Sequence, residues 1–220
     1  MPNYYGGYGY PVFLFYQPAY FFLSLIFTYF IPDILAASYA SNIAIFFLGG
    51  AGVLMLTRKL TSNRAVSLFC SVMFLLTPYV YVNLYVRGDL SELMAMFVTP
   101  WILFLLIRLK DKILAKEAFV PSVLLLSLVI ALLVYSHPFT AMFFYPLFIA
   151  VMLAMGFDLD KKSRLPFLLA GAGSLACATV FSSPYWFSAF ILKNYVDYNP
   201  AVGASNSAAG QVVYFQHTLS

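Results

Sequence analysis

Apolar residues fall into seven long runs along the 220-residue chain, separated by short polar or charged segments. The runs lie at 11–31, 34–57, 65–86, 90–107, 118–135, 138–157 and 165–183. A helix of about 20 apolar residues crosses the hydrocarbon core of a bilayer, and the runs are of that length. A transmembrane barrel would instead show segments of about ten residues with alternating polarity. The stretch LLLSLVIALLVYS at 124–136 is continuously apolar, so the pattern predicts membrane-spanning helices.

The first run differs from the other six. It contains Pro11 and Pro18, and proline interrupts helical hydrogen bonding. The preceding MPNYYGGYGY carries four Tyr, three Gly and no charge, a composition that suits the membrane interface. Two interpretations follow for 11–31: a juxtamembrane helix on the outer face, or a seventh span. The predicted fold is an all-α polytopic integral membrane bundle of six spanning helices plus this N-terminal helix.

Composition narrows the class of protein. The chain is 63% hydrophobic and 9% charged, whereas soluble proteins are about 45–50% apolar and about 25% charged. A water-soluble enzyme and a disordered chain are therefore excluded. The net charge of +4 is spread between the apolar runs rather than gathered in one patch, which argues against nucleic acid as a partner.

The basic residues predict an orientation. Ten of the 12 lie in three connections, at 58–64, 108–117 and 158–164: Arg58, Lys59, Arg64, Arg108, Lys110, Lys112, Lys116, Lys161, Lys162 and Arg164. Because Lys and Arg accumulate on the cytoplasmic side of short loops, we expect these three connections to face the cytoplasm. The predicted location is the plasma (cytoplasmic) membrane, with multiple passes.

The whole chain, 1–220, is expected to form a single membrane domain. Residues 1–33 would supply an outer loop and the juxtamembrane helix, and 34–183 the six-helix bundle. Beyond it, 184–199 is aromatic and predicts an interfacial helix, while NPAVGASNSAAG at 199–210 is typical of a flexible linker.

Soluble-enzyme motifs are missing from the sequence. It contains no metal-spaced His/Cys cluster, no phosphate-binding glycine loop and no nucleophile elbow. Cys70 and Cys177 both fall within predicted spans, where a free thiol is usually a small packing group.

The predicted outward turn NLYVRGDLSELMA at 83–95 carries the strongest candidate site, because it places Arg87, Asp89 and Glu92 next to hydrocarbon. The Arg87 guanidinium is suited to two-point binding of a phosphate, and the alternatives are a pair with Glu92 or a lipid headgroup contact. Asp89 and Glu92 also have the offset of a capping box, which is the structural interpretation of both carboxylates.

A second outward turn contains His137, followed by Pro138 at a favourable first helical position. An interfacial hydrogen-bonding role competes there with a role as a catalytic base. Tyrosines on the same side would give a cavity aromatic walls and hydroxyls, and an ordinary aromatic belt is the alternative. These outer tyrosines are Tyr10, Tyr16, Tyr79, Tyr81 and Tyr85. The predicted substrate-binding residues are Arg87, Asp89, Glu92, His137, Tyr10, Tyr16 and Tyr85.

Four stretches in this order give the chain a family resemblance: GYGYPVFLFYQP (7–18), YVNLYVRGDLSELMAMFVTP (81–100), YSHPFT (135–140) and SPYWFSAF (183–190). They resemble the polytopic membrane proteins called 6-pyruvoyl-tetrahydropterin synthase-related. That family is similar to GT-C membrane glycosyltransferases, which use polyprenyl-phosphate sugars at the outer membrane face. The label implies no pterin chemistry here.

Position by position, the resemblance marks ten residues: Gly7, Gly9, Pro11, Tyr16, Pro18, Arg87, Gly88, Glu92, Ser136 and His137. Two positions depart from it, since family members often have Asn where this chain has Pro138 and a proline where it has Gln17. GT-C enzymes also begin with a further helix and an acidic catalytic loop, and this chain is expected to start downstream of them. The catalytic residues are therefore unassigned. The resemblance favours the juxtamembrane interpretation of 11–31.

The resemblance implies a GT-C-like glycosyltransferase, or part of one, that acts on a polyprenyl-phosphate-linked sugar. The expected partners are membrane lipid and this donor, with a partner chain also open. No cofactor is required and no metal site is predicted, although Asp89 or Glu92 could position a divalent cation. The alternatives are a non-catalytic membrane scaffold or inactive transferase fragment and, with less support, a transporter subunit.

Overall fold

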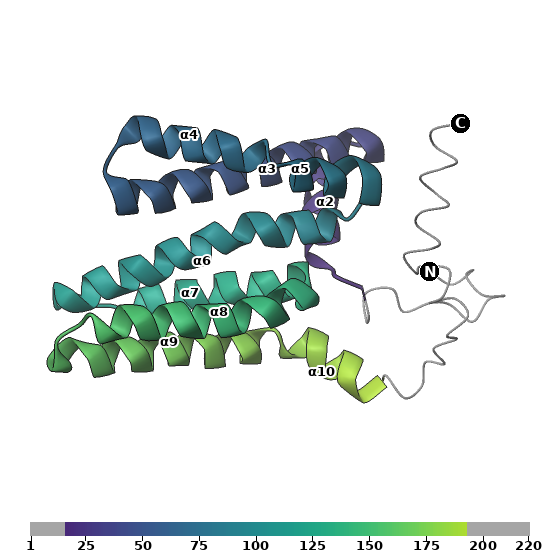
Figure 1. Ribbon diagram of the computed structural model, residues 1–220. Coiled ribbons are helices and arrows are strands. Elements are labelled where there is room, and N and C mark those ends of the chain that lie inside the picture. The colour runs from purple at the N-terminus through teal and green to yellow at the C-terminus, as the bar shows by residue number, and fades with distance from the viewer. Residues whose placement is uncertain (1–15, 193–220) are drawn as a thin grey trace, which may run out of the picture. The chain divides into compact units, whose positions relative to one another are not determined.

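The computed structural model describes residues 16–192, and these form helices joined by short turns, with no strand among them (Figure 1). The chain divides into a compact unit that ends at Tyr185 and a second unit that begins at Trp186. Several predicted features lie outside the described residues. They are Tyr10 as a site residue, the resemblance positions Gly7, Gly9 and Pro11, the start of the first apolar run, the end of the predicted interfacial helix at 184–199, and the linker at 199–210.

The described helices are α2 (Ala19–Phe30), α3 (Ile34–Thr61), α4 (Arg64–Leu75), α5 (Pro78–Tyr81), the π-helical η2 (Val82–Arg87), α6 (Leu90–Leu114), α7 (Val120–Ser136), α8 (Pro138–Phe157), α9 (Lys161–Phe181) and α10 (Ser183–Leu192). Polar side chains accept hydrogen bonds from first-turn amides of α3, α4, α6, α8 and α9, because the first N–H groups of a helix have no partner within it. These capping residues are Asp33, Asn63, Asp89, His137 and Asp160.

Five segments are long and apolar enough to cross a membrane: α3, the stretch Arg64–Arg87, α6, α8 and α9. This confirms the predicted class, an all-helical multi-pass membrane protein. Apolar α7 has 17 residues and α2 has 12. At 1.5 Å per residue α2 alone is about 18 Å long, shorter than a hydrocarbon core of about 30 Å. Six spans remain a prediction.

The predicted run 65–86 is not one continuous helix. Helix α4 ends at Leu75, and Pro78 begins α5. Thr77 has an extended ψ of 131°, as expected for a residue that precedes proline. The chain then continues through α5 into η2, so the end of this segment that carries Arg87 is offset from α4.

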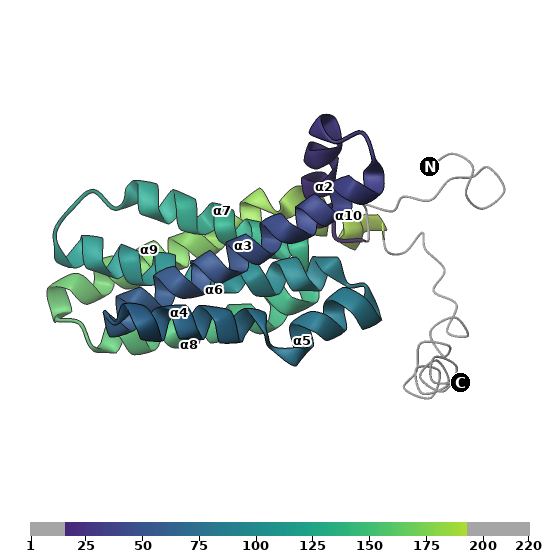
Figure 2. The same ribbon diagram turned by 90° about the horizontal axis from the view of Figure 1, so that it is seen from above.

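Helix α6 lies at the centre of the unit that ends at Tyr185 and is the most buried of the five segments. Helix α3 packs on one side of it, and α7 and α9 on another; Figure 2 shows α3 crossing over α6. Glycines permit the close approach of α3, since a Cβ on Gly49 would lie 2.5 Å from the ring of Phe97. The Trp101 indole donates to the Leu48 carbonyl at 2.8 Å, which also joins α6 to α3.

The turns within this unit gather at two ends. The α3–α4, α6–α7 and α8–α9 turns, which carry the basic residues, lie at one end of the bundle in Figure 1, called here the basic end. The η2–α6 and α7–α8 turns lie at the opposite end, called the Arg87 end. The candidate charged residues and the basic connections are thus separated by the length of the helices.

Candidate functional site

Two turns that are distant in sequence meet at the Arg87 end. The η2–α6 turn contributes Asp89 and the α7–α8 turn contributes His137, whose Nε2 lies 3.9 Å from Asp89 Oδ2. This distance is too long for a direct hydrogen bond. Three predicted site residues, Arg87, Asp89 and Glu92, therefore join a fourth, His137, in one cluster.

Arg87 is held by partners from both sides of its turn. Tyr79, Asn83 and Arg87 are spaced four residues apart along α5 and η2, so they share one side of this segment. Arg87 Nη1 donates to Asn83 Oδ1 at 2.8 Å and to Tyr79 Oη at 3.1 Å. The same nitrogen lies 2.6 Å from Glu92 Oε2, while Nη2 lies 3.5 Å from Asp89 Oδ2. Among the described residues, both hydrogen bonds of the guanidinium leave from Nη1, and Nη2 makes only the longer approach to Asp89, so the edge formed by Nη2 and Nε has hydrogens for an incoming oxygen.

The turn after Arg87 depends on Gly88. Its φ is +63°, in the left-handed region that glycine adopts without steric cost. A Cβ at this position would meet no atom within 4 Å, so the backbone conformation rather than crowding favours glycine here.

The capping-box prediction is half correct. Asp89 Oδ1 accepts the Glu92 amide at 2.9 Å and caps α6 as expected. The Glu92 side chain does not complete the box, because the Asp89 amide donates to the Asn83 carbonyl at 3.0 Å. Glu92 instead pairs with Arg87 and accepts a short hydrogen bond from the Tyr79 hydroxyl.

His137 is oriented by the helix that it caps. Its Nδ1 accepts from the Thr140 amide at 3.2 Å and lies 2.8 Å from Thr140 Oγ1. A ring nitrogen that accepts a backbone hydrogen carries no hydrogen of its own, so in the neutral ring the hydrogen is assigned to Nε2, which faces Asp89. Its neighbour Ser136 is fully buried and donates to the Leu132 carbonyl, a bond within its own helix.

A divalent cation is a poor fit to this cluster. Asp89, Glu92 and His137 place ligand atoms within 4.8 Å of one another. However, the Arg87 guanidinium already neutralises Glu92, and a cation on Nε2 would require His137 to give up its cap on Thr140. With neutral His137, Arg87 and the two carboxylates leave a net charge of −1. The arrangement is suited to hydrogen bonding rather than to metal coordination.

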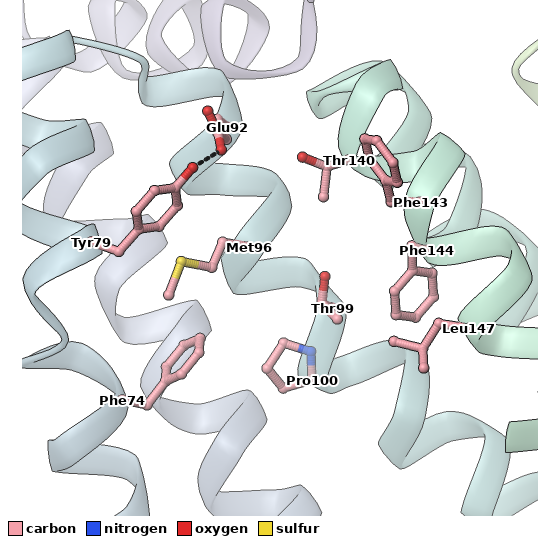
Figure 3. Close-up of a pocket in the computed structure, with 10 residues that line it drawn as sticks. All are labelled: Phe74, Tyr79, Glu92, Met96, Thr99, Pro100, Thr140, Phe143, Phe144 and Leu147. Carbon is pink, nitrogen blue, oxygen red and sulfur yellow. Dashed lines mark hydrogen bonds between the residues drawn. The ribbon is translucent and has the colours of Figure 1, made fainter.

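A cavity of about 360 Å³ opens beside this cluster, between α6, α8 and the α4–α5 segment. Figure 3 shows Tyr79, Glu92 and Thr140 at one end, and Phe74, Pro100 and Leu147 at the other. The remaining lining residues are Met96, Thr99, Phe143 and Phe144. The cavity therefore leads from charged and hydroxyl groups into an apolar region of the spanning helices.

Of the tyrosines predicted for the site, Tyr16 and Tyr85 lie in the described residues, and only Tyr16 lies near the cluster. The pKa of Tyr16 is raised, first by burial and second by the negative charge of Asp89, so this residue lies within electrostatic range of the cluster. Tyr85 is 77% exposed, stacks on Tyr81 at 6.3 Å and lines a different cavity. Tyr85 is thus not brought together with Arg87.

Sequence reasoning missed three residues that hold the cluster: Tyr79 as a member of the site, Asn83 and Thr140. Tyr79 and Asn83 precede Arg87 by eight and four positions, a helical spacing visible in the sequence. Thr140 follows His137 by three, which is a capping offset. Whether these three residues belong to the site depends on the directions in which the Arg87 and His137 side chains point. The spacing of residues along the sequence does not determine those directions.

Comparisons of the chain with protein-family models, with curated proteins and with solved structures find no match. The resemblance to the 6-pyruvoyl-tetrahydropterin synthase-related membrane proteins therefore stays a prediction.

Proposed function

We propose that the chain binds a polyprenyl-phosphate-linked sugar at the outer membrane face and belongs to a GT-C-like membrane glycosyltransferase, as the whole enzyme or as its donor-binding part. One observation carries the proposal. Glu92 and Tyr79 of the charged cluster, together with Thr140, line one end of an otherwise apolar cavity between membrane-spanning helices. A lipid-linked sugar has the same order of groups, with a polar sugar, an anionic phosphate and a hydrocarbon tail.

Each part of such a donor has a matching surface. The Nη2 and Nε edge of Arg87 offers donors to phosphate oxygens in two-point fashion. The hydrogen on His137 Nε2 and the Thr140 hydroxyl offer further donors to phosphate or sugar oxygens. The start of the tail would lie against Met96, Phe144 and Leu147. A volume of about 360 Å³ holds only this first part, and the rest of the tail would extend into the bilayer.

The reaction proposed is transfer of the glycosyl group from phosphate to an acceptor hydroxyl. The bond from the anomeric carbon to phosphate oxygen breaks, a bond to the acceptor oxygen forms, and the acceptor proton passes to a base. Arg87 would stabilise the negative charge on the leaving phosphate. The base is not assigned to a residue of this chain.

The experiment is donor binding to the full chain in nanodiscs, with a polyprenyl-phosphate hexose as the probe. Arg87→Ala should weaken binding by about tenfold or more, because it removes a charge-assisted contact to phosphate. Leu147→Trp should weaken it by filling the apolar end of the cavity. Arg58→Ala, at the basic end, is the matched control and should bind as the parent does.

A polyprenol without phosphate separates the two contributions. Its binding should respond to Leu147→Trp and not to Arg87→Ala. Donor binding that is unchanged in both variants, with folding verified by size-exclusion chromatography, would refute the proposal.

The non-catalytic scaffold remains the second candidate, because the ion pairs of Arg87 with Glu92 and Asp89 suffice to explain all three charged residues as structural. A scaffold predicts that Arg87→Ala lowers stability without changing lipid binding in the protein that remains folded. The same binding series therefore distinguishes the two candidates.

A further inference from the structure

A cavity of about 990 Å³ lies in a groove between α3 and the segment formed by α4, α5 and η2. Its floor is the contact of Gly50 with Ser71, where the Ser71 hydroxyl donates to the Gly50 carbonyl at 2.7 Å. Its rim includes Phe47 and Leu68, which are exposed. Exposed sides of spanning helices face lipid, so the groove is open to the bilayer. It shares no lining residue with the cavity beside Glu92.

The groove has one polar end and one apolar end. Tyr39, Asn42, Tyr81 and Tyr85 line it near the Arg87 end, and Leu54 and Leu68 line it toward the basic end. From Tyr39 to Leu54 along α3 the distance is about 22 Å at 1.5 Å per residue. One leaflet of the hydrocarbon core is about 15 Å thick. The groove is therefore long enough to hold a lipid tail that extends through the whole hydrocarbon thickness of one leaflet.

The polar end has hydrogen-bonding groups already oriented. Asn42 Oδ1 accepts the hydroxyl of the buried Tyr20 at 2.7 Å, which leaves the Asn42 amide hydrogens as donors. Tyr81 and Tyr85 lie nearly parallel, 12° between ring planes, and form a flat aromatic wall. Such a wall and such donors are suited to the C–H faces and the hydroxyls of a sugar or glycerol head.

No Asp, Glu, Lys or Arg lines this groove in the described part of the chain. A phosphate head would thus enter a low-dielectric surface without a counter-charge, which is unfavourable. The uncharged lining of the groove therefore favours a lipid with an uncharged head group. The cluster at Arg87, in contrast, contains charged groups.

We propose that this groove binds one lipid with an uncharged, hydroxyl-bearing head, in preference to anionic lipids. The head lies among Asn42, Tyr81 and Tyr85, and a tail lies along α3 past Gly50 toward Leu54. The inference does not depend on the proposed glycosyl transfer, because it concerns a separate cavity.

The test is native mass spectrometry of the full chain released from phosphatidylcholine nanodiscs that contain equal amounts of a monoglycosyl diacylglycerol, a diacylglycerol and phosphatidylglycerol. We expect saturable retention of one uncharged lipid, favoured about tenfold over phosphatidylglycerol. The glycosyl and unglycosylated lipids show whether a sugar or a glycerol head is preferred. Non-saturable retention of all lipids alike indicates annular lipid only and overturns the proposal, as does a preference for phosphatidylglycerol.

Two variants locate the site. Ala51 is exposed on the groove, so Ala51→Phe should fill it and reduce retention about tenfold. Ala150→Phe, at an exposed position on α8 away from the groove, is the matched control and should leave retention unchanged. Tyr85→Leu should lower retention and Tyr29→Leu should not, since Tyr29 is exposed outside the groove.

A crosslinking measurement makes the test independent of variant folding. A monoglycosyl diacylglycerol or diacylglycerol with a diazirine in its acyl chain should label the parent protein within 39–54 and 68–85. Labelling spread evenly over all lipid-facing helices would refute the site.

Discussion

The guanidinium nitrogen Nη1 of Arg87 lies 2.6 Å from Glu92 Oε2 and so joins the last residue of η2 to the first turn of α6. The Glu92 carboxylate is only 15% exposed and also accepts from the Tyr79 hydroxyl, so removal of its cation leaves a poorly hydrated charge. The pair therefore has a structural role in addition to the proposed role of Arg87 in binding phosphate.

A double-mutant cycle of Arg87→Met and Glu92→Gln should give a coupling free energy of about 1–2 kcal/mol, because both partners hold charge-assisted hydrogen bonds. The measurement is the free energy of unfolding in detergent micelles. Lys59 and Asp111, 2.7 Å apart with both side chains more than 40% exposed, supply the control cycle. That pair should couple by about 0.5 kcal/mol or less. Equal coupling in the two pairs would show that partial burial of Glu92 has no effect.

Substitutions of Asp89 separate its capping role from its charge. Asp89→Asn keeps an oxygen for the Glu92 amide, whereas Asp89→Ala removes it and should lower the free energy of unfolding by about 1 kcal/mol. If the carboxylate serves only as a cap, Asp89→Asn should retain full donor binding in nanodiscs. If binding falls in Asp89→Asn while stability is kept, the charge itself contributes to the site.

The α3–α6 interface should not tolerate a side chain at Gly49. A Cβ there would lie 2.5 Å from the ring of Phe97, which is fully buried, so Gly49→Ala should lower the free energy of unfolding by about 1–3 kcal/mol. Gly173→Ala in α9 is the matched control, since no atom lies within 4 Å of its Cβ position. Because alanine is the better helix former, Gly173→Ala should be neutral or stabilising by about 0.5–1 kcal/mol. A Gly49→Ala protein as stable as the parent would contradict the observed packing.

The orientation predicted from the charged loops can be tested with single cysteines. In a background with Cys70→Ala and Cys177→Ala, we expect Ile34→Cys to react with a membrane-impermeant maleimide in intact cells. Ala118→Cys, in the turn between α6 and α7 at the basic end, should react only after permeabilisation. The reverse pattern would place the Arg87 cluster on the cytoplasmic face and would remove the basis for an outer-face transferase.

Much of the helical architecture follows from local features of the sequence. The apolar runs predict the spanning segments because hydrocarbon excludes unpaired backbone groups, and a helix satisfies them within one segment. Capping side chains such as Asp33 and Asn63 mark where helices begin, for the same reason of unpaired amides. The break before Pro78 could also have been predicted from the sequence, because proline disfavours a helical conformation in the residue before it.

The candidate site was predictable only where its partners are close in sequence. Arg87, Asp89 and Glu92 lie within six positions of the sequence, so their association could be expected from proximity along the chain alone. The other partners of Arg87, Tyr79 and Asn83, have a helical spacing in the sequence, but their role depends on the direction in which the Arg87 side chain points, which spacing alone does not fix.

The sequence by itself determined the membrane class, most of the helices and the separation of the basic turns from the turn that carries Arg87, because hydropathy, capping and loop charge act over a few residues. Tertiary structure decided which distant groups meet. The packing of α7 and α8 against α6 brings His137 close to Asp89. Tyr85 instead lines the groove along α3 and lies apart from the Arg87 cluster. Side-chain packing between helices sets these pairings, and in an apolar chain many pairings satisfy the same hydropathy pattern.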